Sequence, residues 1–113
     1  MFSEAVKKYI AEMVEGGNWR PKTKKQQETS YDMFKELMGD LPVSSYKRTD
    51  ISEYKDKLAL IPASCQKKLP GTPFSKVVTM QHGLPILNIA TRNKRLVELS
   101  SLFGWCEKNG YRG

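Results

Sequence analysis

The sequence predicts an all-α protein, a compact bundle of four to five helices, on three observations. Apolar residues recur at the three- and four-residue spacing of helices that have one buried side. No segment shows the strict alternation of apolar and polar residues that a half-buried strand requires. The length of 113 residues lies in the range of about 100 to 150 residues in which one hydrophobic core suffices. We therefore expect a single helical domain over residues 1–113.

The first two helices are expected between recognisable start and stop signals. Ser3 is a residue type that caps helix starts, and Gly16–Gly17 should end the first helix. Thr23 has capping-box spacing to Gln26 at the start of the second helix, which should end at Gly39. The apolar stripes that define these helices are Phe2, Val6, Tyr9, Ile10 and Met13, then Tyr31, Phe34, Leu37 and Met38. The first two turns of the second helix carry almost no apolar residue, so we expect them to face solvent or a ligand.

A third helix is expected after a loop over residues 40–47, which contains Pro42 and two serines. Thr49 or Asp50 should cap this helix, and Pro62 should stop it. Its buried residues are predicted to be Ile51, Tyr54, Leu58 and Ile61. The helix therefore contributes one apolar side to the core.

The last helix gives the clearest pattern of the chain. Thr91 should cap it and Gly110 should end it, with a core stripe of Leu96, Leu99, Phe103 and Cys106 and with Leu102 beside that stripe. Helix boundaries between residues 62 and 90 stay open, because two prolines and a glycine interrupt the segment 70–73. One short helix is expected there from Phe74, Val77, Val78 and Met80.

The net charge of +7 is concentrated in the second half of the chain. Residues 1–56 hold ten basic and ten acidic side chains, whereas residues 57–113 hold nine basic ones against Glu98 and Glu107. The cations that accumulate between residues 57 and 97 are Lys57, Lys67, Lys68, Lys76, Arg92, Lys94 and Arg95. A polyanion is the natural partner for such a region. The alternative is a solvated basic surface that keeps the protein soluble, and charge alone leaves both open.

Several other classes of protein are disfavoured. The longest uncharged stretch, residues 77–91, is too polar to span a bilayer, and charged residues near the amino terminus argue against a secretory signal. We expect a cytoplasmic protein without membrane contact. Cys65 and Cys106 are too few for a disulfide framework or a zinc site, and His82 has no second ligand at metal spacing. No metal or other cofactor is therefore expected.

Residues 91–111 carry a pattern that resembles a known family. The pattern consists of Thr91-Arg92-Asn93-Lys94-Arg95-Leu96, then Leu99-Ser100-Ser101-Leu102-Phe103-Gly104-Trp105-Cys106, then Asn109-Gly110-Tyr111. It is similar to the core-binding (N-terminal, SAM-like) domain of phage-integrase-family tyrosine recombinases. That family has Thr-x-Asn-(Lys/Arg)-x-Leu, Leu-x-x-Leu-Phe-x-Trp-Ala and x-Gly-(Tyr/Trp) in this order. The likeness extends over nearly the whole chain, with two departures, which are Cys106 in place of alanine and the proline-containing segment 62–73.

The resemblance implies a DNA-binding domain of a site-specific tyrosine recombinase or prophage integrase, which clamps duplex DNA at the recombination core site. Its other expected partners are the catalytic domain of the parent chain and further recombinase protomers on DNA. The catalytic domain is expected to be absent from this chain, because His82 is followed by Gly83-Leu84-Pro85 and not by a His-x-x-Arg motif. The chain is therefore expected to be a non-catalytic fragment. Tyr9, Tyr31 and Tyr54 fall on core stripes, which argues against a nucleophilic role.

The expected DNA contacts lie at the starts of the second and last helices, where free backbone N–H groups and the helix dipole favour phosphate. The cations in these positions are Lys22, Lys24, Lys25, Arg92, Lys94 and Arg95, and we expect them to share one surface. The amides of Gln26, Gln27 and Asn93 could read adenine edges, or else serve as caps or surface groups. The predicted site comprises the six cations together with Gln27 and Asn93. A plain solvated face is the alternative for the cations.

Two other functions remain open at this level. A helix-turn-helix-like transcriptional regulator would need a short turn between adjacent helices, and the connections expected here are too long. A helical protein-interaction module with an acidic partner would use the same basic residues for another purpose. Binding to duplex DNA, compared with binding to acidic protein ligands, separates these possibilities.

Overall fold

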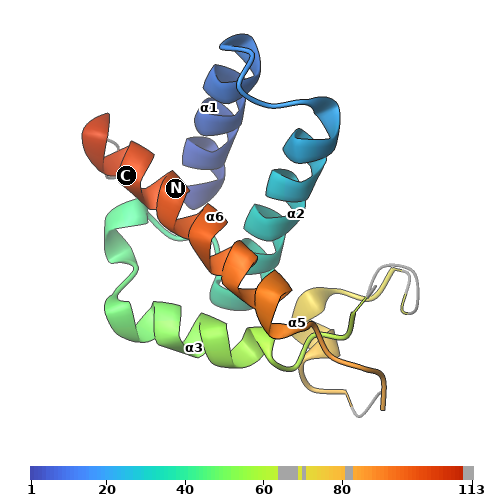
Figure 1. Ribbon diagram of the computed structural model, residues 1–113. Helices are drawn as coiled ribbons and strands as arrows, with labels where there is room; N and C mark the ends of the chain where they lie inside the picture. The colour runs from blue at the N-terminus through green and yellow to red at the C-terminus, as the bar shows by residue number, and fades with distance from the viewer. Residues whose placement is uncertain (64–68, 70, 81–82, 111–113) are drawn as a thin grey trace.

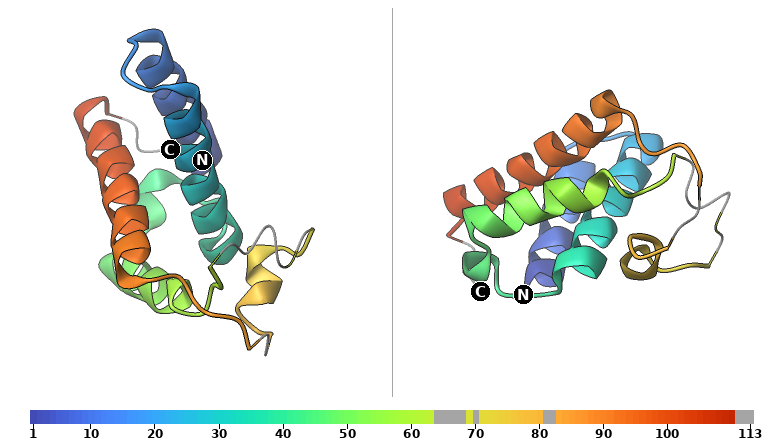
Figure 2. Two further views of the ribbon diagram at one scale, coloured as in Figure 1. Left: turned by 45° about the vertical axis from the view of Figure 1, so that its right-hand side comes forward. Right: turned by 90° about the horizontal axis from the view of Figure 1, so that it is seen from below.

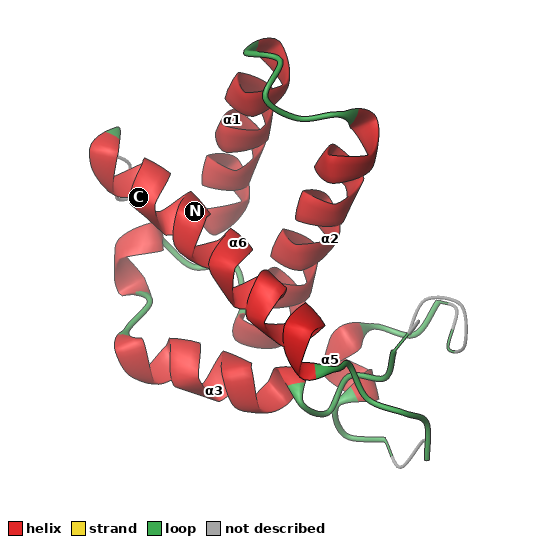
Figure 3. Ribbon diagram, in the orientation of Figure 1, coloured by secondary structure: helices red, strands yellow, loops and turns green. Residues whose placement is uncertain are grey.

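The regular structure of the computed structural model is helical, which confirms the predicted all-α class. The structure describes residues 1–63, 69, 71–80 and 83–110, and in these it contains helices joined by loops, with no strand (Figure 3). The helices are α1 (Phe2–Glu15), α2 (Pro21–Met38), the short 3₁₀ helix η1 (Val43–Ser45), α3 (Arg48–Leu58), α5 (Phe74–Val77) and α6 (Ile89–Lys108). The predictions for Cys65, Lys67, Lys68 and His82 lie outside the described residues.

The helices are arranged around α2 and α6. Helices α1 and α2 stand side by side and run in opposite directions, and α6 crosses and packs on both of them (Figure 1). Seen from below, α3 lies alongside α6 and runs antiparallel to it (Figure 2). The short helix α5 packs against α2. None of the described helices has the length and apolar content that a membrane span needs.

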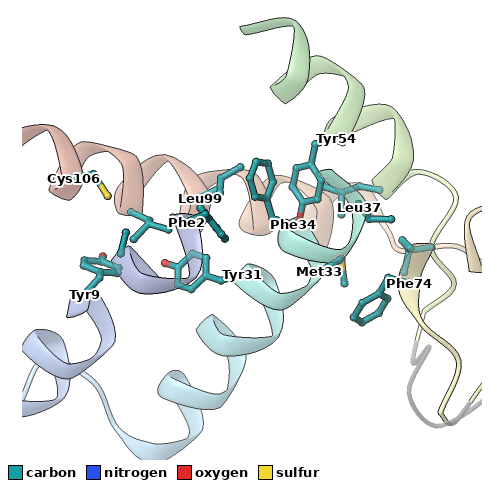
Figure 4. Close-up of a cluster of buried hydrophobic side chains, with 14 of the residues drawn as sticks. Phe2, Tyr9, Tyr31, Met33, Phe34, Leu37, Tyr54, Phe74, Leu99 and Cys106 are labelled. Atoms are coloured by element: carbon teal, nitrogen blue, oxygen red, sulfur yellow. The ribbon is translucent and has the colours of Figure 1, made fainter. Parts of the chain in front are cut away.

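The core is built on aromatic side chains from α1, α2 and α3, to which α6 adds Leu99 and Cys106 (Figure 4). Phe34 is fully buried, and its ring centroid lies 5.0 Å from that of Phe2, 4.9 Å from that of Tyr54 and 6.0 Å from that of Phe103. The rings of these pairs are tilted or edge to face, which is the arrangement that aromatic quadrupoles favour. The predicted stripe of α2 is confirmed at Tyr31, Phe34 and Leu37, which are buried.

The helices begin earlier than the sequence signals predicted. Helix α2 starts at Pro21, because proline fits the first helical position, where an N–H group would lack a helical partner. Thr23 is therefore inside the helix and does not cap it. Helix α6 starts at Ile89, and the side chain of Asn88, not that of Thr91, provides the cap by accepting the Thr91 N–H at 2.8 Å.

The other two predicted caps are also displaced. Ser3 lies inside α1, where its backbone N–H and its hydroxyl donate to the carboxylate of Asp40 at 2.9 and 2.6 Å. Asp40 thus caps α1 from the far end of α2, and the hydrogen bond from the Ser3 hydroxyl lowers the pKa of that carboxyl. Helix α3 starts at Arg48, with Lys47 as its N-cap residue, and Asp50 accepts the Lys47 N–H at 2.8 Å. Thr49 takes no part in this cap.

Polar contacts position both α3 and the segment that follows it. The ammonium of Lys57 donates to the carbonyl of Leu37 at 3.1 Å, in the last turn of α2, and lies 3.4 Å from the Glu53 carboxylate. Beyond α3, an antiparallel bridge pairs Pro62 with Ile86 and places the segment after α3 beside the entry to α6. The sequence pattern places Lys57 among the cations available to a polyanion. In the structure, however, its ammonium contacts α2 and Glu53 and is engaged within the fold.

Candidate nucleic-acid interface

The two helix starts that carry the predicted site meet where α6 crosses α2. The ammonium of Lys94 donates to the side-chain carbonyl of Gln26 at 3.1 Å, although the two residues are far apart in sequence. Lys94 is exposed and Gln26 is half-buried. This contact brings the first half of α2 and the first half of α6 to one surface of the molecule.

Arg95 lies within the fold, in contrast to the expected phosphate contact. One guanidinium nitrogen, Nη1, lies 2.6 Å from the Ser30 hydroxyl, 3.2 Å from the backbone carbonyl of Gln26 and 3.4 Å from the Glu98 carboxylate. The side chains of Arg95 and Glu98 are only 16% and 5% exposed. Because Arg95 stands one turn before Leu99 on α6, it shares the buried side of that helix. Its charge is neutralised by Glu98 inside the bundle, so it is not a free cation.

Gln27 is also engaged internally. The Tyr31 hydroxyl lies 2.6 Å from the side-chain carbonyl of Gln27 and 3.1 Å from the backbone carbonyl of Glu98. Burial raises the pKa of Tyr31, so its phenol stays protonated and serves as a donor in this cluster. Gln27 therefore supports the packing of α2 on α6, and its carbonyl is not free to read a base.

The three lysines near the start of α2 point to different sides of the helix. At about 100° per residue, Lys22 lies about 40° from Gln26 around the axis, Lys25 about 100° and Lys24 about 160°. Lys24 consequently faces α1, where it lines a groove together with Glu28. Lys22 lies on the side away from α1 and next to Gln26, and Lys25 stands on the outer side of the helix, midway between Gln26 and Lys24. Lys24 and Arg95 thus do not share a surface, whereas Lys22 and Lys94 do, with Lys25 at its edge.

The residues at the start of α6 separate in the same way. Asn93 and Lys94 are exposed, and Asn93 follows the outer side of the helix. Arg92 lies about 160° from Lys94 around the axis, is half-buried, and has a buried Nε without a hydrogen-bond partner among the described residues. Arg92 therefore belongs to another side of α6.

We call the set Lys22, Lys25, Gln26, Asn93 and Lys94 the basic face. Within the described part of the chain, its three lysines form no ion pair with a carboxylate. No acidic residue stands in the first turn of α2 or of α6. Cations at a helix start oppose the helix dipole. Helix stability therefore does not explain why α2 begins with lysines.

Sequence reasoning missed the buried polar residues that hold this face in place. Ser30 and Glu98 are buried at the crossing of α2 and α6, and the Ser30 hydroxyl donates to Glu98 at 3.0 Å. A signal was present, because Ser30 stands one turn before Phe34 and Glu98 one turn before Leu102, on stripes that are otherwise apolar. Buried polar groups at such positions pair with one another. Together with Arg95 they hold α6 on α2.

The remaining reactive or aromatic groups lie in the core. Tyr9 contacts Trp19 and Trp105, with ring centroids 5.3 and 5.4 Å apart, so both tryptophans pack on the bundle. Burial raises the pKa of the Cys106 thiol, which keeps it protonated. Among the described residues no group of His, Cys, Asp and Glu could hold a metal ion. No protein-family model, curated protein or solved structure matches this chain.

Proposed function

We propose that this chain binds duplex DNA as the core-binding domain of a phage-integrase-type tyrosine recombinase. The observation that carries the proposal is the basic face, in which lysines from two helix starts meet on one surface without carboxylate partners in the described residues. The pattern over residues 91–111 that resembles this family supports the recombinase assignment. In this proposal the catalytic domain of the parent chain supplies the chemistry, and further protomers bind the same DNA.

The residues of the basic face have different tasks in the proposal. Lys22, Lys25 and Lys94 carry flexible point charges that contact backbone phosphates without reading sequence. The Gln26 side-chain carbonyl accepts from Lys94, which leaves its amide nitrogen available as a donor. Asn93 is exposed on the outer side of α6, one residue before Lys94, and has both a donor and an acceptor, as adenine recognition in the major groove requires.

A fluorescence-anisotropy titration of a labelled duplex at several salt concentrations tests the proposal. With about three phosphate contacts, the logarithm of the affinity should fall with the logarithm of the salt concentration with a slope of about −3. The double variant Lys22→Glu/Lys25→Glu should weaken binding at least about tenfold, evenly across sequences. Lys108→Glu is the matched control, because Lys108 is exposed at the other end of α6.

Three results would count against the proposal. They are no binding at low salt, binding that does not depend on salt, and equal losses in the double variant and in the Lys108 control. A helix-turn-helix regulator receives no support from the fold, because residues 39–47, with η1 among them, separate α2 from α3 where that motif has a turn of about three or four residues.

A further inference from the structure

A second surface lies on the side of α6 opposite Lys94. A groove of about 330 Å³ runs between α3 and α6. Its lining is apolar at the centre and basic on one bank, and consists of Arg48, Ile51, Ser52, Lys55, Leu96, Leu99, Ser100 and Phe103. Leu96 and Lys94 are about 160° apart around α6. The groove therefore stays open when a ligand binds Lys22 and Lys94.

We propose that this groove binds an acidic amphipathic helix of a partner protein. The apolar centre favours burial of apolar side chains, since Ile51, Leu96 and Phe103 are only half-buried and Leu99 lies beneath them. Grooves between two helices are a common receptor for the apolar side of a third helix. A phosphate backbone offers no apolar group to match such a centre, which favours a peptide over DNA.

The charges of α3 identify the kind of partner. The helix carries three cations and three carboxylates, so it is neutral as a whole, yet none of its carboxylates lines the groove. Asp50 caps the helix and Glu53 pairs with Lys57, both away from the groove. Arg48 and Lys55 are exposed on the groove bank, and no carboxylate pairs with either within the described residues. The bank is thus left positive, and a partner with carboxylates complements it.

The spacing of the two cations sets the register of the partner. Arg48 and Lys55 are seven residues apart, which is two turns or about 10 Å along α3. On the facing helix, Leu96 and Phe103 are also seven residues apart. The ring of Phe103 contacts Tyr46, just before α3, so Phe103 lies toward Arg48, and the antiparallel course of α6 then places Leu96 toward Lys55. A partner helix that fits the groove has two carboxylates seven residues apart and leucines three and four residues after the first of them. The carboxylates would pair with the cations of α3, and the leucines would contact the apolar side chains of α6.

The experiment uses a labelled synthetic peptide of about 16 residues, long enough to form a helix, with glutamates and leucines at these spacings. Two comparison peptides replace the glutamates with lysines or the leucines with serines. We expect the first peptide to bind at least about tenfold more tightly than either comparison peptide, and Arg48→Glu/Lys55→Glu to weaken it about tenfold. Ser100→Trp, which fills the groove from an exposed position, should abolish binding.

Each variant is also titrated with duplex DNA and checked for folding by circular dichroism. Unchanged DNA affinity in the Arg48/Lys55 variant supports a peptide site that is separate from the DNA site. Backbone NMR shift changes that the peptide causes only in α3 and α6 support the location of this site in the groove. The proposal is overturned if the peptides bind alike, if binding survives the groove variants, or if those variants lose DNA binding as the Lys22/Lys25 variant does. Self-association of the chain through this groove, seen by sedimentation without peptide, would also overturn it.

Discussion

The two halves of α2 face different environments. Residues 30–38 supply Ser30, Tyr31, Met33, Phe34 and Leu37 to the buried interior. Residues 21–29 contain no buried side chain, and their lysines are exposed. Because one continuous helix carries both halves, the packed half holds the exposed half in a defined position. The helix thus separates, along its length, residues that pack the core from residues that face solvent.

The largest loss of stability is expected from a substitution in the packed half of α2. Phe34→Ala removes a fully buried ring that contacts Phe2, Tyr46, Tyr54 and Phe103. Loss of a buried aromatic side chain lowers the free energy of unfolding by about 3 to 5 kcal/mol. Urea denaturation followed by circular dichroism measures this loss, with Phe34→Leu as a milder variant. Lys25→Ala is the comparison in the exposed half and should stay within about 0.5 kcal/mol of the parent protein.

A smaller effect is expected where the two halves of α2 meet α6. Arg95→Met leaves the buried Glu98 carboxylate without its cation and should cost about 3 kcal/mol of unfolding free energy. Replacing both residues, in Arg95→Met/Glu98→Leu, should cost less, because no charge is left buried and unpaired. Additive losses in this double-mutant cycle would show that the two side chains do not interact.

The same variant separates a structural role for Arg95 from a DNA-binding role. Where Arg95→Met is still folded, its affinity for duplex DNA should remain within about twofold of the parent, because the guanidinium is already paired inside the bundle. Lys94→Met is the matched change on the exposed side of α6 and should weaken DNA binding. A large loss of DNA affinity in the folded Arg95 variant would place this arginine on the interface.

The smallest effect is expected at the start of α2. Lys22→Glu and Lys25→Glu should each raise the unfolding free energy by about 0.5 kcal/mol, because a negative charge suits the positive end of the helix dipole. Lys108→Glu, at the carboxyl end of α6, should lower it by a similar amount. Both effects should fade in about 1 M salt. A loss of stability in the α2 variants would mean that these lysines support the fold.

Most of the fold could be predicted from apolar periodicity, and the helix starts could not. The residues of the predicted stripes lie in the core or, as with Val6, Ile51 and Leu96, are partly buried against it, because burial imposes the helical period on the sequence. The cap of α1 comes from Asp40, which is distant in sequence, so no local motif near Ser3 reveals it. The start of α2 was misplaced for another reason, since a proline at the first helical position outweighs the threonine signal two residues later.

The candidate site was predicted by residue type, and the orientation of each side chain came only from the packing. Lys94 and Arg95 are adjacent cations in the sequence, yet one is exposed and the other is buried against Glu98. Lys22 and Lys24 diverge in the same way, because they lie about 160° apart around α2. A count of charges therefore overstates the cations available to DNA, and the buried stripe of each helix corrects it.

The contact between Lys57 and Leu37 makes the two ends of α2 electrically unequal. An ammonium group sits against the carbonyl end of the helix and offsets the partial negative charge there. At the opposite end Pro21 brings no N–H group, and the partial positive charge is joined by lysines and by no acid in the first turn. The positive tip is therefore the end of α2 without local compensation, and in the proposed DNA complex it would attract the polyanion over a distance.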